Sequence, residues 1–263
     1  MPFRVYFQSA LLIIIGLVIC YLLRRRWVFL LLFLGIVVGV CGLLLPCFPL
    51  FGNAFCEGNS RKKIIALTFD DGPNEPYTSQ ILSILEKYKI HATFFILGEN
   101  AQRLPDSVVQ IVAAGNVVGN HTMDHAPLVF KTREEILGEI EKWEKVTLPL
   151  IPSPQGRGSF LLFRAPHGWK SPFLSSVLQQ KGYRLIGWTR GVWDTDRPGI
   201  DILLSRVVSH PENGMILLLH DGEDIKVGGD RSQTVAVLPR IIDTYQQLGY
   251  RFVTIPEMLK FSE

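Results

Sequence analysis

The sequence predicts an α/β protein whose main domain is a barrel of about seven strands, preceded by an N-terminal transmembrane hairpin. The first 50 residues are almost entirely apolar. After Arg61-Lys62-Lys63, short apolar runs alternate with segments of helical periodicity, which is typical of βα units around a parallel sheet. Seven strand candidates suit a barrel better than an open sheet.

Residues 1–56 are predicted to form a membrane anchor with two apolar segments, at about 5–23 and 27–50. No charge interrupts the second segment, which is long enough to cross a bilayer as a helix. Arg24-Arg25-Arg26 separates the two, and such a cluster tends to stay in the cytoplasm. Both Met1 and the chain after Phe51 would then lie outside, with residues 57–63 as a linker.

A signal peptide is the alternative interpretation of this N-terminus, with cleavage near Gly52-Asn53-Ala54. The apolar sequence is long and doubled for a signal peptide, which favours the anchor. Both interpretations export the same domain. We therefore expect residues 64–263 at the cell membrane, on its extracytoplasmic side.

Charge and cysteine content restrict the possible partners and the need for cross-links. Residues 61–263 contain 23 basic and 23 acidic side chains, so the domain has no electrostatic footprint for nucleic acid. The four cysteines all lie in or beside the anchor, at positions 20, 41, 47 and 56. We accordingly expect the exported domain to need no disulfide and to be stabilised by its core.

The strands are expected where short apolar runs are bounded by turn residues. Their predicted ranges are Ile64–Phe69, Ala92–Leu97, Asn116–Gly119, Ser159–Phe163, Tyr183–Trp188, Met215–Leu219 and Arg251–Thr254. Helices between them show apolar stripes. The stripes comprise Ile81, Ile84, Leu85 and Tyr88; then Ile136, Ile140 and Trp143; then Leu238, Ile241, Ile242 and Tyr245.

One segment does not fit this alternation. Residues 148–159 contain three prolines and two glycines, which predicts a surface excursion with little regular structure.

Two short polar motifs, each directly after a predicted strand, suggest a hydrolytic metal site. Asp70-Asp71 directly follows the first strand and offers one carboxylate to hold a cation and one to accept a proton. His121 and His125 follow the third strand, and their spacing lets both imidazoles face one ion from a single helical turn. One carboxylate, two histidines and a water are the ligands of a catalytic zinc.

Further polar residues follow the other strands. Arg164 comes after the fourth, Asp194 after the fifth and His220 after the sixth. Active sites of βα barrels are built at the carboxyl ends of the strands. We therefore expect these side chains to lie close to the first two polar motifs. Taken singly, each of these motifs is also compatible with an ordinary turn or a surface residue.

These motifs together resemble the five ordered motifs of the polysaccharide deacetylase family, also called the NodB-homology domain or carbohydrate esterase family 4. The motifs are Thr68–Gly72, His121–His125, Arg164–Gly168, Asp194 and Leu218–His220. The resemblance covers essentially residues 61–260. It implies a distorted (β/α) barrel and metal-dependent removal of N-acetyl, less often O-acetyl, groups from sugars.

The resemblance implies a role for each motif residue. Asp71, His121 and His125 would be the metal ligands. Asp70 would be the general base that takes a proton from the attacking water, and His220 would protonate the leaving amine.

The remaining motif residues would support this chemistry. Arg164 would keep Asp70 ionised, and Asp194 would favour the imidazolium form of His220. The backbone N–H of His167, which follows Pro166, would stabilise the oxyanion, and Leu218 would help form a recess for the acetyl methyl group. Each also has an ordinary interpretation, as an ion pair or as core.

Two positions depart from the family pattern. His167 stands where the family usually has a tyrosine, which changes the sugar-binding wall. Asp194 is followed by Thr195 where the family commonly has a tryptophan, which puts the shape of the acetyl recess in doubt. Asp124 lies between the two histidines and is either a partner of a ligand histidine or a solvated residue.

The sequence therefore predicts a membrane-tethered N-deacetylase of a cell-surface polysaccharide such as peptidoglycan or an N-acetylglucosamine polymer. Zn2+ is the expected cofactor, and Co2+ or Ni2+ would fit the same ligands. Its partners would be an N-acetylated glycan and the membrane, with no nucleic acid and no protein partner. The alternatives are a deacetylase or deformylase of a lipid-linked sugar, and a catalytically inactive glycan-binding module.

Overall fold

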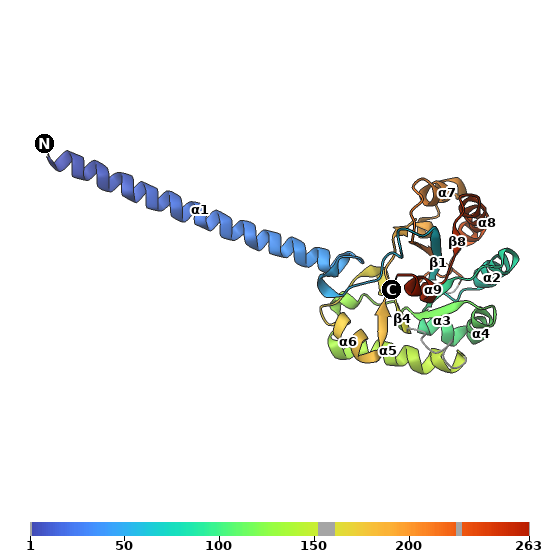
Figure 1. Cartoon of the computed structure of the whole chain (residues 1–263). Helices are drawn as coiled ribbons and strands as arrows, with labels where there is room; N and C mark the ends of the chain where they lie inside the picture. Colours follow the sequence, from blue (N-terminus) through green and yellow to red (C-terminus); the bar gives the residue numbers. More distant parts are fainter. Residues whose placement is uncertain (1, 152–160, 225–227, 263) are drawn as a thin grey trace. The chain divides into compact units, whose positions relative to one another are not determined.

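The structure is a computed structural model, and it describes residues 2–151, 161–224 and 228–262. It divides into two compact units, Met1–Gly42 and Leu43–Glu263. Residues 43–56, which we expected in the anchor, thus make their contacts within the second unit. The described strands all belong to this second unit (Figure 1).

Helix α1 runs from Pro2 to Leu44 without interruption. The expected turn at Arg24-Arg25-Arg26 does not occur in this described segment, and one helix contains the first apolar segment and residues 27–44 of the second. The reason is local: arginine is a good helix former, and residues 17–34 contain neither glycine nor proline. Leu23–Leu44 has the length and composition of a membrane span. The structure thus bears out an apolar N-terminal helix but differs from the expected hairpin.

The described residues form one sheet of eight strands. They are β1 (Ile64–Asp70), β2 (Thr93–Ile96), β3 (Val117–Asn120), β4 (Leu161–Phe163), β5 (Tyr183–Leu185), β6 (Arg190–Gly191), β7 (Met215–His220) and β8 (Arg251–Phe252). All seven predicted strands are present, although residues 159–160 of the fourth lie outside the described residues. The two-residue β6 is additional.

The strands pair in the order β5-β4-β3-β2-β1-β7-β6, with β8 beside β1, and all pairings are parallel. The sheet is curled, and the chain between its two end strands links them. Ile186 N–H donates to Phe163 O at the end of β4 (2.8 Å), and Thr189 N–H donates to Ile216 O in β7 (3.0 Å). The predicted barrel is thereby confirmed in its distorted form.

Alternation along β1 separates two cores. Ile65, Leu67 and Phe69 are buried against the outer helices. Ile64 and Ala66 face the barrel interior, where Met258 of α9 (Ile255–Lys260) closes one end. Because side chains alternate along a strand, Asp70 shares the interior face with Ile64 and Ala66.

The outer helices surround the sheet in Figure 1. They are α2 (Tyr77–Tyr88), α3 (Gly98–Arg103), α4 (Pro105–Ala113), α5 (Arg133–Thr147), α6 (Leu174–Lys181), α7 (Ile200–Val208) and α8 (Ser232–Gln247). The predicted stripes lie on α2, α5 and α8, and most of their residues are buried. The start of α5 is fixed by a capping box, in which Thr132 and Glu135 satisfy each other's backbone N–H groups.

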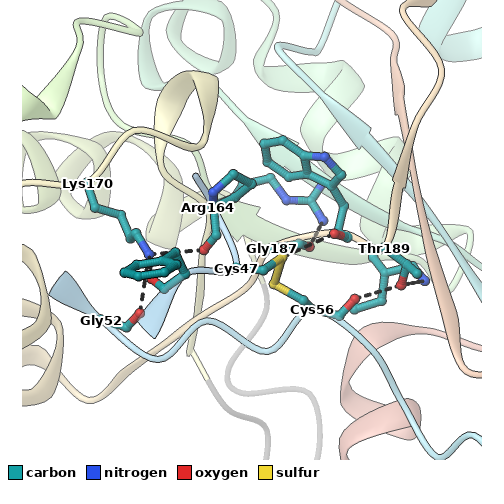
Figure 2. Close-up of a disulfide and its surroundings, with 11 residues drawn as sticks. Cys47, Gly52, Cys56, Arg164, Lys170, Gly187 and Thr189 are labelled. Carbon is teal, nitrogen blue, oxygen red and sulfur yellow. Dashed lines mark hydrogen bonds between the residues drawn. A yellow bond between two sulfur atoms is a disulfide. The ribbon is translucent and has the colours of Figure 1, made fainter. Parts of the chain in front are cut away.

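The structure contains a disulfide that we did not expect. Cys47 and Cys56 are bonded, with their Cα atoms 6.0 Å apart, and Figure 2 shows the bond beside Gly187. The error came from assigning residues 43–56 to the anchor, whereas the fold places them against the strands. Cys41 is free within the described residues.

The expected surface excursion at residues 148–159 is described only in part. Leu148–Leu150 forms a 3-10 helix that continues α5, and residues 152–159 lie outside the described residues.

Candidate metal centre and active site

The predicted site residues lie at the carboxyl ends of the strands. Asp70 ends β1 and His220 ends β7, and the two are paired in register. His121 follows β3, Arg164 follows β4, and Asp194 begins a 3-10 turn (Asp194–Asp196) after β6. The side chains therefore converge at one end of the sheet.

A cavity of about 470 Å³ opens at this end. Among the predicted site residues, its lining includes Asp70, Asp71, His121, His125, His167, Leu218 and His220. Arg164 and Asp194 are buried behind this lining, where they contact residues that do face the cavity. Pro166 is also buried, in the turn that carries His167.

Three of these residues form a compact ligand set. The Nε2 atoms of His121 and His125 each lie 3.3 Å from Oδ1 of Asp71, and one ligand atom from each residue lies within 4.8 Å of the others. Oδ1 of Asp71 is buried and has no hydrogen-bond partner among the described residues. A buried carboxylate oxygen facing two imidazole nitrogens fits a divalent cation, which would satisfy all three.

Both histidines come from a loop, so the expected helical turn is wrong. Thr122 and His125 have positive φ values, 73° and 61°. Asn120 Oδ1 accepts the Thr122 N–H (2.8 Å), and Thr122 Oγ1 accepts the His125 N–H (3.1 Å). These short-range bonds replace helical ones and turn both rings toward Asp71.

Contacts at Nδ1 orient the two rings. Nδ1 of His121 lies 2.9 Å from the carbonyl oxygen of Arg164, so the N–H sits there and Nε2 remains free to bind a cation. Nδ1 of His125 lies 3.0 Å from a carboxylate oxygen of Asp224. Asp124, in contrast, accepts the Ala126 N–H and caps the loop. The partner of His125 is thus Asp224, which sequence reasoning missed.

Asp70 is held by a buried arginine. Nη1 of Arg164 donates to Asp70 Oδ1 (2.7 Å) and to Thr68 Oγ1 (2.8 Å). The guanidinium lies over the Phe95 ring, with Cζ 4.1 Å from its centroid. Arg164 is completely buried, so this charge-assisted bond is shielded from water and fixes the orientation of the Asp70 carboxylate. The second oxygen of Asp70 lies 3.7 Å from Nε2 of His121.

Asp194 holds His220. Its Oδ1 lies 2.8 Å from Nδ1 of His220, and its Oδ2 accepts the His220 backbone N–H (2.9 Å) and the Thr234 hydroxyl (2.8 Å). Burial by itself lowers the pKa of His220, but the Asp194 carboxylate outweighs it and raises that pKa to about 9. The contact with Asp194 therefore favours the protonated form of the His220 ring.

Aromatic rings form one wall of the cavity. The His167 ring meets the His125 ring edge-on, with centroids 4.6 Å apart, and lies 5.0 Å from Trp169. Trp188 and Trp193 also line the cavity, and Trp193 is 68% exposed. His167 has φ 57°, and burial lowers the pKa of its ring.

Asp221 was also missed by sequence reasoning. It is fully buried directly after His220, and its Oδ2 accepts the Thr78 hydroxyl (2.6 Å). Burial raises its pKa to about 7. Asp221 also lies against the α-carbon of Gly72, where any side chain would collide with it. The only sequence signal was a carboxylate adjacent to a motif histidine.

The fold and this geometry define a curled (β/α)-barrel protein with a His/His/Asp centre fit for a divalent metal. The chain belongs to the polysaccharide deacetylase family, whose profile matches residues 57–186. A peptidoglycan-N-acetylglucosamine deacetylase of Bacillus cereus is 38% identical over 215 residues, covering 80% of this chain and 94% of the relative. A chitooligosaccharide deacetylase of Rhizobium leguminosarum bv. trifolii is 34% identical, with 77% and 95% coverage.

Solved structures agree with this assignment. A crystal structure of a peptidoglycan N-acetylglucosamine deacetylase with a bound benzamide compound matches with TM-score 0.71 and 30% identity, covering 77% of this chain and 91% of that one. A family pseudoenzyme from Bacillus anthracis matches with TM-score 0.70 and 26% identity, covering 79% and 69%. The fold thus occurs in both active and inactive proteins.

Proposed function

We propose that this protein is a metal-dependent hydrolase that removes N-acetyl groups from an N-acetylglucosamine-containing glycan. One observation carries the proposal. The ligand set Asp71, His121 and His125 lies in the same cavity as a carboxylate with a buried arginine partner, Asp70, and an imidazolium with a buried carboxylate partner, His220.

The donor set suits zinc, with Co2+ or Ni2+ as alternatives, because two imidazoles and one carboxylate leave further positions open. When bound, the cation would acidify a water and polarise the acetyl carbonyl. The Nδ1–H of His121 donates to the Arg164 carbonyl, so the lone pair at Nε2 is available to bind the cation.

The remaining chemistry is divided between Asp70 and His220. Asp70 accepts a proton from water as the water oxygen bonds to the acetyl carbon. His220 then donates a proton to the amide nitrogen as the C–N bond breaks, releasing acetate and a free sugar amine. Arg164 orients Asp70 through a buried hydrogen bond, and Asp194 favours the protonated form of His220.

The oxyanion and the acetyl methyl group need their own contacts. We assign the first to the backbone N–H of His167, whose ring lies beside that of His125, and the second to Leu218, which is buried and lines the cavity. Pro166 fixes the start of the His167 turn.

Peptidoglycan and chitin-like oligomers are the substrates favoured by the relatives, whose names specify these glycans. Because one of the structural neighbours is a pseudoenzyme, an inactive glycan-binding module is the alternative function. The complete set of candidate base, acid and ligand side chains in this chain favours catalysis. A lipid-linked sugar would suit an enzyme held at a membrane.

Two observations support an exported, membrane-tethered protein. Leu23–Leu44 is long and apolar enough to span a bilayer. The Cys47–Cys56 disulfide is typical of an oxidising compartment outside the cytoplasm. We therefore place the domain on the extracytoplasmic side, either anchored by α1 or released after signal cleavage.

Acetate release by the full chain tests this function. The protein would be stripped with a chelator, reloaded with zinc, and assayed on N-acetylglucosamine oligomers and on peptidoglycan fragments. Zinc-restored acetate release from either glycan supports the proposal, and the rate ratio identifies the preferred one. A folded, zinc-loaded protein that binds a glycan without releasing acetate would be an inactive module. A protein that is active only on lipid-linked sugars would support the alternative substrate class, a lipid-linked sugar.

A further inference from the structure

The segment Pro46–Glu57 lies between α1 and β1 in the sequence, and we call it the clasp. Its ends are joined by the Cys47–Cys56 disulfide. Its second half runs beside the residues that close the barrel: Phe55 forms a parallel bridge with Ile186, and Glu57 an antiparallel bridge with Met215 of β7. The clasp is therefore part of the sheet's construction.

The clasp contacts Gly187 through backbone hydrogen bonds and through the disulfide. Phe55 N–H donates to the Leu185 carbonyl (2.9 Å), and Gly187 N–H donates to the Phe55 carbonyl (3.0 Å). A methyl group on Gly187 would lie 2.5 Å from Sγ of Cys56. The disulfide thus packs directly against the α-carbon of Gly187, and the Thr189 hydroxyl donates to the Cys56 carbonyl just beyond (2.7 Å).

Gly187 in turn contacts the arginine that holds Asp70. Nη2 of Arg164 donates to the Gly187 carbonyl (2.9 Å), while Nη1 donates to Asp70 (2.7 Å). A guanidinium is planar and rigid, so the position of the Gly187 oxygen fixes the direction in which Nη1 points. Figure 2 shows Arg164 reaching past the disulfide toward Gly187.

Lys170 attaches the clasp to the other wall of the cavity. Its side chain is buried, and Nζ donates to the carbonyls of Phe48, Pro46 (3.2 Å) and Gly52 (3.5 Å). Its backbone N–H donates to the Leu43 carbonyl (2.8 Å). Lys170 directly follows Trp169 and lies three residues from His167 in the sequence.

We propose that the clasp is a positioning element of the active site: it holds Gly187, and through the Gly187 carbonyl it orients Arg164 against Asp70. This inference rests on the proposed function. It assigns a catalytic consequence to Cys47, Cys56 and Lys170, none of which lines the metal centre.

A purely stabilising role makes a different prediction. If the clasp only held the fold together, a variant without the disulfide would unfold more easily but the folded fraction would turn over at the original rate. A positioning role lowers kcat in the folded protein. It leaves KM and metal content nearly unchanged, because the sugar wall and the three ligands remain.

The decisive variant is Cys47→Ala/Cys56→Ala in the full chain, with Cys41→Ser as the matched control that removes a thiol outside the clasp. Zinc content, thermal unfolding, kcat and KM would be measured on N-acetylglucosamine oligomers. We expect kcat of the double variant to fall by about 10- to 100-fold at a temperature where it is folded, as misplacement of a catalytic group by about 1 Å does. We expect KM and zinc content within about twofold of wild type.

Lys170→Met and Lys170→Arg test the same clasp without touching the disulfide. Lys170→Met keeps the apolar stem but loses the bonds to three carbonyls, so kcat should fall; Lys170→Arg should restore most of it. Unchanged kcat in both the double variant and Lys170→Met would overturn the proposal, whatever their stability.

A crystal structure of the double variant separates this proposal from the proposed function. We expect the Arg164–Gly187 and Arg164–Asp70 bonds, 2.9 and 2.7 Å in the intact protein, to lengthen or break. If both stay intact, the clasp does not position Arg164. If the wild type itself releases no acetate from any glycan, the proposed function fails, and these two distances still decide the positioning role.

Discussion

Replacing Asp194 with asparagine removes a charge from His220 while preserving the shape of the site. In the structure, Asp194 accepts from the ring, from the His220 backbone and from Thr234. Asparagine retains one oxygen acceptor but not the negative charge. We therefore expect Asp194→Asn to fold and bind zinc while shifting the titration of His220.

The size of the shift follows from the causes of the pKa. Burial lowers the pKa of His220, whereas Asp194 and, to a smaller extent, Asp71 and Asp70 raise it, with the result that the pKa is about 9. If loss of the Asp194 charge returns the pKa to the ordinary histidine value of 6.5, the change is roughly 3 kcal/mol at 1.36 kcal/mol per unit. At pH 8, the fraction of His220 in the acidic form then drops about 30-fold, and kcat/KM should drop at least as far.

The assay is kcat/KM for acetate release from pH 5 to pH 10, with zinc-saturated protein. Wild type should lose activity above about pH 9, and Asp194→Asn above about pH 6.5 or lower. Thr234→Val is the matched control, since it removes one bond to Asp194 but keeps the charge. If the basic limb of Asp194→Asn coincides with that of wild type, His220 is not the acid that Asp194 tunes.

Three further outcomes follow from the same contacts. His121→Ala should lower zinc affinity more than tenfold by isothermal titration, and an unchanged affinity would remove His121 from the ligand set. Arg164→Met leaves Asp70 buried without its charge partner, so the free energy of unfolding in urea should fall by about 3–5 kcal/mol, whereas a change under 1 kcal/mol would contradict the buried pair. In the presence of a chelator, the difference in unfolding free energy between wild type and Asp194→Asn should be largest below pH 6.5 and should vanish as the pH rises through about 9. The reason is that the folded protein raises the pKa of His220. A difference that grows with pH would contradict this reasoning.

Much of this fold follows from local sequence. The seven predicted strands are short apolar runs, and the polar residues after them converge because parallel strands end at one edge of a sheet. The apolar stripes of α2, α5 and α8 gave the buried faces of the outer helices. These features depend on periodicity, which the sequence displays directly.

Other features depend on contacts between distant residues. Asp224 approaches His125 and Asp221 approaches Thr78 only in the folded chain. The loop that carries His121 and His125 has backbone bonds specific to Asn120 and Thr122, so a spacing rule suggested a helical turn instead. The two-residue β6 is too short to produce a periodic signal.

The disulfide was missed for a similar reason. Cys47 and Cys56 follow an apolar run without a clear break, so composition assigned them to the anchor. Their bonding requires residues 43–56 to return to the sheet, which the bridges from Phe55 and Glu57 specify. The continuous helix α1 likewise reflects the helix propensity of arginine. The predicted turn came instead from the rule that arginine clusters stay on the cytoplasmic side of a membrane.

The central claim is that Asp71, His121 and His125 hold the metal while Asp70 performs the proton transfer. Wild type and Asp70→Asn, each stripped and reloaded with zinc, would be compared for zinc content and acetate release on the same glycan. The account predicts one zinc in both proteins and acetate release from wild type alone, with a loss of at least 100-fold in Asp70→Asn. Equal acetate release by the two, or full release by metal-stripped wild type, would contradict it.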